Sequence, residues 1–495
     1  DHTRLHFDLQ EDFTQVKASL SVRRNPVSKD QNASLVLHGD KELELLELMI
    51  DGQQLESSAY QRDDKELTIF APGDQFELEI KTRIYPDKNT ALEGLYRSEG
   101  MYCTQCEAEG FRRITFYMDR PDVMSVFETT ISADKAQYPV LLSNGNQVEQ
   151  GDSEDGRHFA VWQDPFPKPA YLFALVAGDL AHIEDTFTTK SEREVVLRVY
   201  ADPKDLDKLD FSMVSLKKSM TWDEEVYGRE YDLDLFNIVA VDFFNMGAME
   251  NKGLNIFNTS CLLAHPETTT DATFQRVEAI VAHEYFHNWS GNRVTCRDWF
   301  QLSLKEGFTV FRDAEFSADM NSRTVKRIED VKTLRTGQFS EDAGPMAHSI
   351  RPESFIEISN FYTRTVYEKG AEVVRMVHTL LGAEKFRAGS DLYFERHDGQ
   401  AVTTDDFLSA MQDASGRDLS QFKNWYNQAG TPLLTITDSY DAQTQRYDLH
   451  IAQSCPATPG QTEKLPFHMP VIIGLLDEEG NDIALQQGTS QLLEV

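Results

Sequence analysis

The chain has 495 residues, of which 40% are hydrophobic and 11% aromatic, so it can bury several cores and is not mainly disordered. At about 150 residues per domain, a chain of this length is expected to form about three domains. Its 48 lysines and arginines are outnumbered by 82 aspartates and glutamates, which gives a formal net charge of −34. That charge repels a phosphate backbone and argues against nucleic-acid binding, while an acidic cleft that attracts cationic substrates stays compatible with it.

The sequence contains no run of about 18 apolar residues, so no membrane-spanning helix is expected. Its first residues, Asp1–Arg4, lack the apolar core of a signal peptide, although the absence of an initial methionine leaves the true N-terminus open. The cysteines are few and odd in number, which is typical of reduced thiols in an intracellular protein: Cys103, Cys106, Cys261, Cys296 and Cys455. We therefore expect a cytoplasmic monomer that binds no membrane.

Residues 1–180 are predicted to form a β-rich N-terminal domain. Val16–Val22 and Phe76–Ile80 alternate apolar and polar residues with the period of a strand, and turn-forming residues such as Pro72-Gly73 separate such runs. Within this part, Cys103-Thr-Gln-Cys106 has the spacing of a zinc knuckle or a redox motif. No second cysteine pair and no βαβ pattern accompany it, so two ordinary thiols are the favoured interpretation.

Residues 181–430 are predicted to mix strands with long helices. Phe236–Val241 is expected to be a strand, and Thr273–Trp289 an amphipathic helix with Gly291 as its stop signal. Arg364–Leu381 is a second amphipathic helix candidate.

Residues 431–495 again alternate as strands, at Leu433–Thr437, Tyr447–Ile451 and Val471–Leu476. About 65 residues are few for a β-sandwich of roughly 100, so the chain is expected to stop inside this domain.

The strongest chemical signal is His283-Glu284-Tyr285-Phe286-His287. Positions i and i+4 share one face of a helix, so both imidazoles can reach one metal ion, and Glu284 is placed to take a proton from a metal-bound water. A chance match, or a buried and hydrogen-bonded histidine pair, is the alternative interpretation.

A catalytic zinc site needs a third protein ligand and an open position. Glu306 lies 19 residues after His287. Ser303-Leu304-Lys305-Glu306 also fits a capping box, in which Glu306 would bond the Ser303 backbone. With the histidine pair upstream we favour Glu306 as the ligand, which predicts one Zn²⁺ per chain and a water that Glu284 activates to attack a carbonyl.

An exopeptidase also needs a group that binds the free α-amine of its substrate. Gly247-Ala248-Met249-Glu250-Asn251 follows a predicted strand and precedes the metal helix. A glycine beside a carboxylate suits the close approach of a peptide backbone and an ion pair with its ammonium group. Without further information, an ordinary turn with a solvated glutamate would explain this segment as well.

Taken together, these motifs resemble the aminopeptidase N family of zinc metallopeptidases, in particular its bacterial alanyl branch. The resemblance runs from near residue 5 to the end of the chain and includes further matching stretches: Cys103–Gly110, Asp164–Pro169, Val241–Met246, Asn292–Phe300 and Thr365–Gly370. It implies a multidomain α+β fold with a β-rich saddle domain (1–180), a thermolysin-like α/β catalytic domain (181–430) and a partial β-sandwich (431–495). Full-length members carry a further helical C-terminal domain, which this chain is expected to lack.

The resemblance also implies a role for each matching residue. His283, His287 and Glu306 would bind zinc, Glu284 would be the general base, and Tyr367 would donate a hydrogen bond to the developing oxyanion. The substrate's free N-terminus would be bound by Glu250 with Gln105 and Glu107. The remaining substrate-binding positions would be Met246, Gly247, Ala248, Met249 and Asn251.

The sequence thus predicts a zinc aminopeptidase that removes one residue, including alanine and basic residues, from peptides with a free N-terminus. Three alternatives stay open: a thermolysin-like endopeptidase, a relative of leukotriene hydrolases, and an inactive truncated fragment that only binds peptides. The leukotriene-hydrolase group usually has Gly-Gly-Met-Glu-Asn, so Ala248 argues against it.

Overall fold

The computed structural model describes residues 1–28, 30, 32–153, 155–485 and 490–495. Its internal contacts divide the chain into two compact units, and each is described by itself. The first unit comprises Asp1–Asp298 with His397–Val402, and the second comprises Trp299–Arg396 with Thr403–Val495. The predicted domain boundaries at residues 180 and 430 stay predictions.

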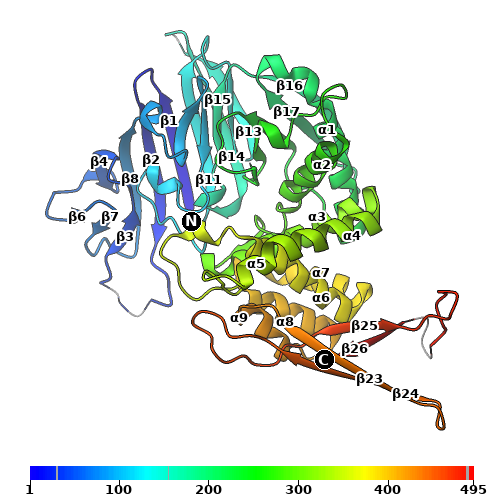
Figure 1. Ribbon diagram of the computed structural model, residues 1–495. Coiled ribbons are helices and arrows are strands. Elements are labelled where there is room, and N and C mark those ends of the chain that lie inside the picture. The colour runs from blue at the N-terminus through cyan, green and yellow to red at the C-terminus, as the bar shows by residue number, and fades with distance from the viewer. Residues whose placement is uncertain (29, 31, 154, 486–489) are drawn as a thin grey trace. The chain divides into compact units, whose positions relative to one another are not determined.

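The first unit is built on an eight-stranded sheet in the order β13-β14-β11-β1-β2-β8-β4-β5 (Figure 1). Only β1 and β11 pair in parallel; the other neighbours are antiparallel. The strands are β1 (His2–Leu9), β2 (Thr14–Arg23), β4 (Glu44–Ile50), β5 (Gln53–Gln54), β8 (Gln75–Ile84), β11 (Met124–Asp134), β13 (Asn146–Asp152) and β14 (Arg157–Pro169). The predicted strands Val16–Val22 and Phe76–Ile80 lie within β2 and β8.

Alternating burial along these strands explains why the sequence folds into this sheet. In β11 every second side chain is buried, so one face covers a core while the other meets solvent or half-buried neighbours. Aromatic rings fill that core: Phe7 stacks on Phe173 with ring centres 5.6 Å apart, and Phe111 meets Phe127 edge to face.

Two smaller sheets complete the β-rich part. One has the order β12-β15-β10-β9, and the other is β3-β7-β6. Their strands are β3 (Leu35–His38), β6 (Tyr60–Arg62), β7 (Glu66–Ile69), β9 (Gly94–Ser98), β10 (Met101–Gln105), β12 (Val140–Ser143) and β15 (Leu175–Gly178).

A five-stranded mixed sheet in the order β16-β17-β18-β20-β19 follows in the same unit, with helices α1 (Asp210–Trp222) and α2 (Asp271–Phe286). Its strands are β16 (Ala181–Thr188), β17 (Glu194–Ala201), β18 (Leu235–Val241), β19 (Ala248–Met249) and β20 (Leu254–Asn258), and a small ladder joins β21 (Val294–Cys296) to β22 (Gln400–Val402). Every residue of β18 is buried, as expected of a central strand flanked by parallel partners. The two-residue strand β19 is the edge of this sheet.

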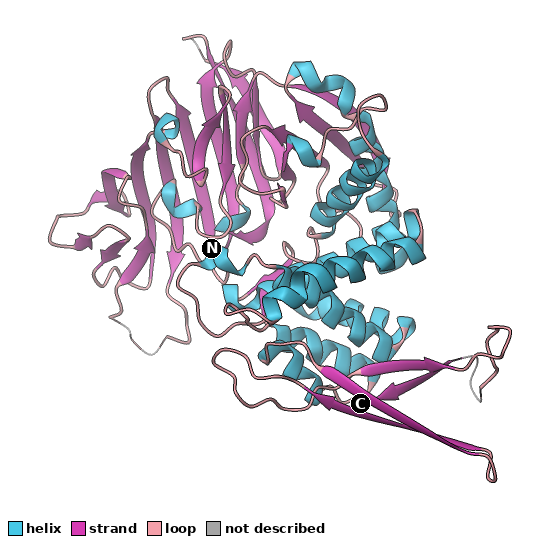
Figure 2. Ribbon diagram, in the orientation of Figure 1, coloured by secondary structure: helices cyan, strands magenta, loops and turns pink. Residues whose placement is uncertain are grey.

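The second unit is mainly helical in its first part (Figure 2). Its helices are α3 (Leu302–Met320), α4 (Arg323–Thr333), α5 (Phe339–Asp342), α6 (Gly370–Leu381), α7 (Ala383–His397), α8 (Thr404–Ser415) and α9 (Asn424–Asn427). Helices α3 and α6 pack closely at two glycines, since a Cβ added to Gly307 would lie 2.8 Å from the carbonyl carbon of Gly370. None of the helices among the described residues has the length and apolar character that crossing a membrane requires.

The last residues form two antiparallel ladders, β23 (Leu433–Asp441) with β24 (Arg446–Ser454) and β25 (Pro470–Gly474) with β26 (Ser490–Glu494) (Figure 2). The three predicted strands are therefore present, but the third ends at Gly474, two residues before its predicted end.

Two predicted helices also differ in detail. The helix expected over Thr273–Trp289 spans Asp271–Phe286, because its last turn gives way to the turn that Gly291 closes. The helix expected over Arg364–Leu381 begins as one π-helical turn, Thr365–Lys369, before α6.

Candidate functional site

Helix α2 carries the two histidines that the sequence singles out. Thr270 caps its N-terminus by accepting a hydrogen bond from the Thr273 amide. One turn apart at the other end, the Nε2 atoms of His283 and His287 lie 3.0 Å from each other. The Nδ1 atom of His287 is 2.9 Å from the Ser290 carbonyl oxygen, which can only accept, so Nδ1 holds the proton and Nε2 presents its lone pair.

These donors fit a zinc ion. Two nitrogens 3.0 Å apart can both lie at the usual zinc–nitrogen distance of about 2.0–2.1 Å from one ion. Ligand atoms of Glu250, Glu284 and His287 also lie within 4.8 Å of one another, and all three side chains are buried. Two imidazole nitrogens, one of them on a ring oriented by a backbone carbonyl, beside carboxylate oxygens form a donor set typical of zinc sites.

Gly291 holds the turn that follows the metal helix. Its φ is +146°, and a Cβ placed there would come 2.8 Å from the Nδ1 atom of His287. The Tyr171 hydroxyl donates to the Gly291 carbonyl oxygen over 3.2 Å. The predicted stop signal is misplaced, because α2 ends at Phe286, five residues before Gly291. Glycine is required at this position because the turn approaches the His287 ring closely.

The segment Gly247–Asn251 lies at the edge of the five-stranded sheet. Ala248 and Met249 form β19 and pair with β20, while Gly247 is exposed and Met246 is half-buried. Glu250 and Asn251 follow and are almost fully buried, with 3% and 0% of their surfaces exposed. An edge strand leaves one row of backbone groups available for another chain.

Gln105 and Glu107, which lie far from this segment in sequence, are close to it in the fold. Gln105, at the end of β10, is fully buried, and its amide nitrogen lies 3.9 Å from the Met249 sulfur. Its Oε1 atom has no hydrogen-bond partner within the part of the chain that the structure describes. Carboxylate oxygens of Glu107 and Glu250 lie within 4.8 Å of each other. An acceptor amide and two carboxylates thus gather at one place.

In the second unit, Glu306 lies in α3 and is 2% exposed. Lys305 donates to its Oε1 atom over 2.6 Å. The capping-box alternative is wrong, because α3 begins at Leu302 and Ser303 already lies inside it. Next in sequence, Gly307 lets α3 approach α6 closely, which places the helix of Glu306 against the segment that carries Tyr367.

Tyr367 lies in the π-helical turn Thr365–Lys369, and both ends of that turn are anchored. Glu341 accepts hydrogen bonds from the Thr365 amide and hydroxyl over 2.8 and 2.7 Å. Lys369 is buried and pairs with Asp342 over 2.9 Å. The backbone on either side of Tyr367 is therefore held, which suits a side chain that must point in a defined direction.

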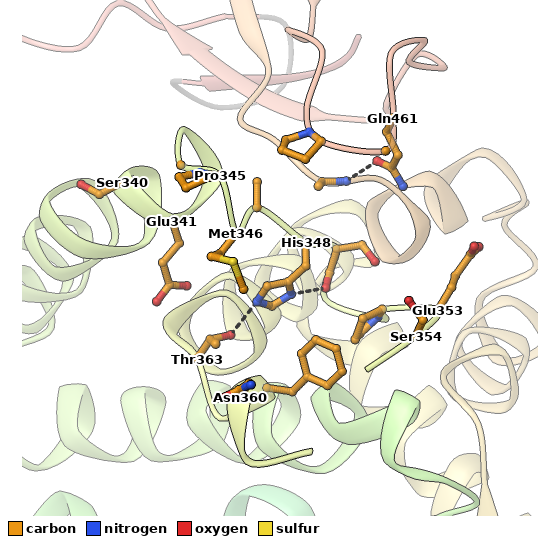
Figure 3. Close-up of a pocket in the computed structure, with 18 residues that line it drawn as sticks. Ser340, Glu341, Pro345, Met346, His348, Glu353, Ser354, Asn360, Thr363 and Gln461 are labelled. Atoms are coloured by element: carbon orange, nitrogen blue, oxygen red, sulfur yellow. Dashed lines mark hydrogen bonds between the residues drawn. The ribbon is translucent and has the colours of Figure 1, made fainter. Parts of the chain in front are cut away.

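A pocket of about 740 Å³ lies beside this turn in the second unit (Figure 3). Glu341, His348 and Thr363 line the pocket, and Figure 3 shows the hydrogen bond between His348 and Thr363. The His348 ring bridges the Thr363 hydroxyl and the Ser349 carbonyl oxygen over 3.1 and 2.8 Å. The pocket wall and the start of the Tyr367 turn thus share one hydrogen-bond network.

The raised pKa of Glu368, the neighbour of Tyr367, predicts that the stability of the fold depends on pH. Burial, together with Asp313 and Asp330, raises its pKa from 4.5 to about 7, against the opposing charges of Lys326 and Arg364. A carboxyl with a raised folded-state pKa stabilises the fold fully below its unfolded value, and this contribution is lost as pH rises through about 7. Glu368→Gln, which mimics the neutral form, should match the wild type near pH 5 and exceed it by about 2 kcal/mol at pH 8.

Thermal unfolding of both proteins between pH 5 and pH 8.5 measures this difference. A stability gap that does not grow with pH would contradict the assignment.

The thiols Cys103 and Cys106 form no disulfide, and their interpretation as ordinary thiols stays a prediction. Both are fully buried and free, and burial raises the pKa of Cys103 to about 12 and that of Cys106 well above its usual value. A thiol held neutral is a poor nucleophile and a poor metal ligand.

Sequence reasoning missed a buried charge cluster next to the histidines, formed by Asp232, Lys252 and Arg293 with Asn288. The only indication in the sequence was that Lys252 lies two residues after Glu250, in a segment whose other residues are mostly buried.

Comparisons with known proteins add three family models. The Peptidase M1 N-terminal domain matches residues 1–172, the Peptidase family M1 domain matches residues 211–426, and a domain of unknown function with an Ig-like fold matches residues 430–495. These agree with the predicted succession of a β-rich domain, an α/β catalytic domain and a β-sandwich-like end.

Curated relatives are similar over almost the whole chain. Aminopeptidase N of Escherichia coli (strain K12) is 58% identical over 484 residues, which cover 98% of this chain and 55% of the relative. Aminopeptidase N of Haemophilus influenzae is 53% identical over 494 residues, which cover 99% and 56%. The chain therefore spans about half the length of the curated relatives it matches.

A solved structure agrees with the fold. The crystal structure of Legionella pneumophila aminopeptidase A in complex with aspartic acid matches with a TM-score of 0.90 and 36% sequence identity. The match covers 100% of this chain and 55% of that one.

Proposed function

The chain belongs to the peptidase M1 family, and we propose on that basis that it carries the catalytic site of a zinc-dependent aminopeptidase. The observation that supports this most directly is the pair of imidazole Nε2 atoms 3.0 Å apart, with the carboxylates of Glu250 and Glu284 close to His287. The substrates would be peptides with a free N-terminus, and the product would be the N-terminal amino acid.

We propose that His283, His287 and Glu306 hold one Zn²⁺. For the histidines the support is their geometry on α2, and for Glu306 it is the separation of 19 residues, the burial of its carboxylate and its start-of-helix position in α3. When bound, the ion would supply Lewis-acid chemistry, polarising the scissile carbonyl and making a water molecule more acidic.

The residues of this chain would then move the protons. Glu284, next to His283 on the same turn of α2, would accept a proton from the attacking water and pass it to the leaving amine. Tyr367, held in its π-helical turn, would donate its hydroxyl to the oxygen that gains negative charge. Both groups are positioned by backbone that is itself anchored, which is what preorganised catalysis requires.

Recognition of the free N-terminus would fall to Glu250, Glu107 and Gln105. An ammonium group needs acceptors, and these residues offer the carboxylates of Glu107 and Glu250 and the Oε1 atom of Gln105. Of the three groups, the Gln105 oxygen has no hydrogen-bond partner within the described residues. The substrate backbone would run along β19, adding a strand to the exposed edge of the sheet beside Gly247, Ala248 and Met249.

Broad selectivity, including alanine and basic residues, is part of the proposal, with Met246 contributing to the pocket for the first side chain. A net charge of −34 would favour the approach of cationic peptides. The relatives are named aminopeptidases, and the solved relative holds aspartic acid, a free amino acid with an α-ammonium group. The cytoplasmic location and the monomeric state stay predictions.

The alternatives make different demands. A thermolysin-like endopeptidase has no use for buried carboxylates that bind an amine, and Ala248 still argues against leukotriene-hydrolase chemistry. A peptide-binding fragment without catalysis would bind substrates but turn none over. An assay of this chain and of a full-length relative on alanyl, arginyl and N-acetylated peptides, with and without chelator, separates the aminopeptidase from the endopeptidase and from the inactive fragment. Cleavage of acetylated peptides, or activity that a chelator leaves intact, would overturn the proposal.

The role of Glu250 makes a separate prediction. Glu250→Ala should lower kcat/KM for free N-termini by about 100-fold, because the ammonium group loses a charge-assisted bond in a buried site. Steady-state kinetics on alanyl and N-acetylalanyl peptides measure this, with Asp242→Ala, a half-exposed carboxylate in the connection after β18, as the matched control. A variant that discriminates against acetylated peptides as strongly as the wild type would remove Glu250 from this role.

A further inference from the structure

A buried ionic cluster joins the segment that follows Glu250 to the turn that follows His287 in the first unit. Lys252 is 1% exposed, pairs with both carboxylate oxygens of Asp232, and donates to the Asn288 side-chain oxygen over 2.8 Å. Asn288 in turn donates to Asp232 over 3.2 Å. Arg293 also pairs with Asp232, over 2.8 Å. Burial lowers the pKa of Lys252, which reflects the free-energy cost of taking its charge out of water.

A buried ionic cluster of this kind is not expected to add much to the free energy of unfolding. A buried ion pair often stabilises a fold no better than apolar side chains of the same volume, because desolvation offsets the attraction. What it does supply is direction, since three bonds to one ammonium group define where the lysine and its backbone lie.

The same two segments are joined a second time through the backbone. The Asn292 side chain donates to the Glu250 carbonyl oxygen over 2.8 Å. Asn144 donates to the Lys252 carbonyl oxygen over 2.9 Å, so side-chain amides hold the carbonyl groups of the residues before and after Asn251.

Asn288 and Asn292, the two asparagines that contact this segment, lie in the short turn that follows α2. Asn288 directly follows His287, and Asn292 closes the turn in which His287 bonds the Ser290 carbonyl oxygen. The segment that carries Glu250 is therefore tied at two points, by Lys252–Asn288 and by Glu250–Asn292, to the turn that orients a proposed metal ligand.

We propose that Lys252, Asn288 and Asn292 are positioning residues that fix the distance between the Glu250 carboxylate and the His287 imidazole. We call these three residues the anchor clamp. This inference rests on the proposed function, because that distance would decide which peptide bond reaches the metal. One residue of extended peptide spans about 3.3 Å, so an amine anchor held at a constant distance presents the first peptide bond and no other. A displacement of about 1 Å can cost a factor of 100 in rate.

A ligand that binds at both points at once tests the clamp without relying on turnover. L-alanine hydroxamate carries an α-ammonium group for the anchor and a hydroxamate for the metal, whereas L-alaninamide and acetohydroxamate each offer one of the two. Linking two binding groups raises affinity only when both sites lie at the matching distance. Calorimetry on the zinc-loaded chain measures all three affinities.

Asn292→Ala removes the bond to the Glu250 carbonyl oxygen, and Lys252→Met removes the ammonium group while Arg293 still faces Asp232. In both variants, the affinity for L-alanine hydroxamate should fall by about 10- to 100-fold, while the affinities for the two single-point probes change by less than about threefold. Asp398→Asn is the matched control, because it breaks the outer ion pair of Arg293, at 2.6 Å, and leaves the clamp intact.

Two results would overturn the inference. Equal loss of affinity for all three probes would mean that the clamp residues only maintain the fold, and an unchanged affinity for L-alanine hydroxamate would mean that they fix no distance. If Lys252→Met does not fold, Asn292→Ala decides alone, since it leaves the buried ion pair in place. A wild-type chain that binds neither zinc nor acetohydroxamate would instead contradict the proposed function.

Discussion

Replacing Glu284 with glutamine is expected to lower kcat by about 100- to 10,000-fold, because the amide cannot accept the proton of the attacking water. The substituted side chain has nearly the same shape, so His283 and His287 should keep their places on α2 and the zinc content should stay near one per chain. Steady-state kinetics on an alanyl amide and metal analysis of the purified protein measure the two quantities together.

The matched control is Glu278→Gln on the same helix, where the carboxylate pairs with Lys218 over 2.7 Å and lies away from the histidine pair. It should leave kcat unchanged. Normal turnover by Glu284→Gln would remove the proposed base. Loss of zinc together with activity would make Glu284 a ligand instead, whereas that loss is the result expected of Glu306→Ala, with affinity reduced by about 100-fold or more.

Replacing Tyr367 with phenylalanine should lower kcat by about 100- to 1,000-fold with little change in KM, because the hydroxyl would act on charge that develops only in the transition state. The aromatic ring and the anchoring of its turn by Glu341 and Lys369 are untouched, so the fold should survive. A comparison of kcat with KM for alanyl and arginyl amides distinguishes this from a binding defect.

Tyr362→Phe is the matched control, because it makes the same substitution at a neighbouring ring, whose centre lies 6.4 Å from that of Tyr367. Its removal of a hydroxyl should leave kcat within about twofold of the wild type. An effect of Tyr367→Phe that appears entirely in KM would show that the hydroxyl contacts the bound substrate rather than the transition state.

Much of the site could be predicted because it depends on neighbours in sequence. The shared face of His283 and His287 follows from the 3.6-residue period of a helix, whatever surrounds it. Gly291 was predicted to lie beyond the end of the helix because glycine is a local helix-ending residue. Its contact with the His287 ring could not be predicted. The proposed third ligand, Glu306, could not be separated from its alternative by sequence alone, because Ser303–Glu306 fits a capping box equally well until the helix is known to begin at Leu302.

The meeting of Gln105 with the segment that carries Glu250 lay beyond such reasoning. Gln105 and Met249 are 144 residues apart, and nothing in either stretch indicates that they meet. Their position was expected only from a family resemblance, and the structure supplies the contact. Neither a local pattern nor the family resemblance predicted the anchor clamp, because a lysine two residues after a glutamate is common at protein surfaces.

The sequence by itself determined the kind of elements and the shared helix face of His283 and His287, the proposed metal donors, because alternation along strands and the helical period act over a few residues. Its net charge of −34 also argues against a nucleic-acid partner. Only the tertiary structure decided which distant side chains meet, where the strand β19 ends a sheet, and that Lys252 is buried. Those features arise from how elements pack across the chain, and packing depends on the shapes of many side chains at once rather than on any local pattern.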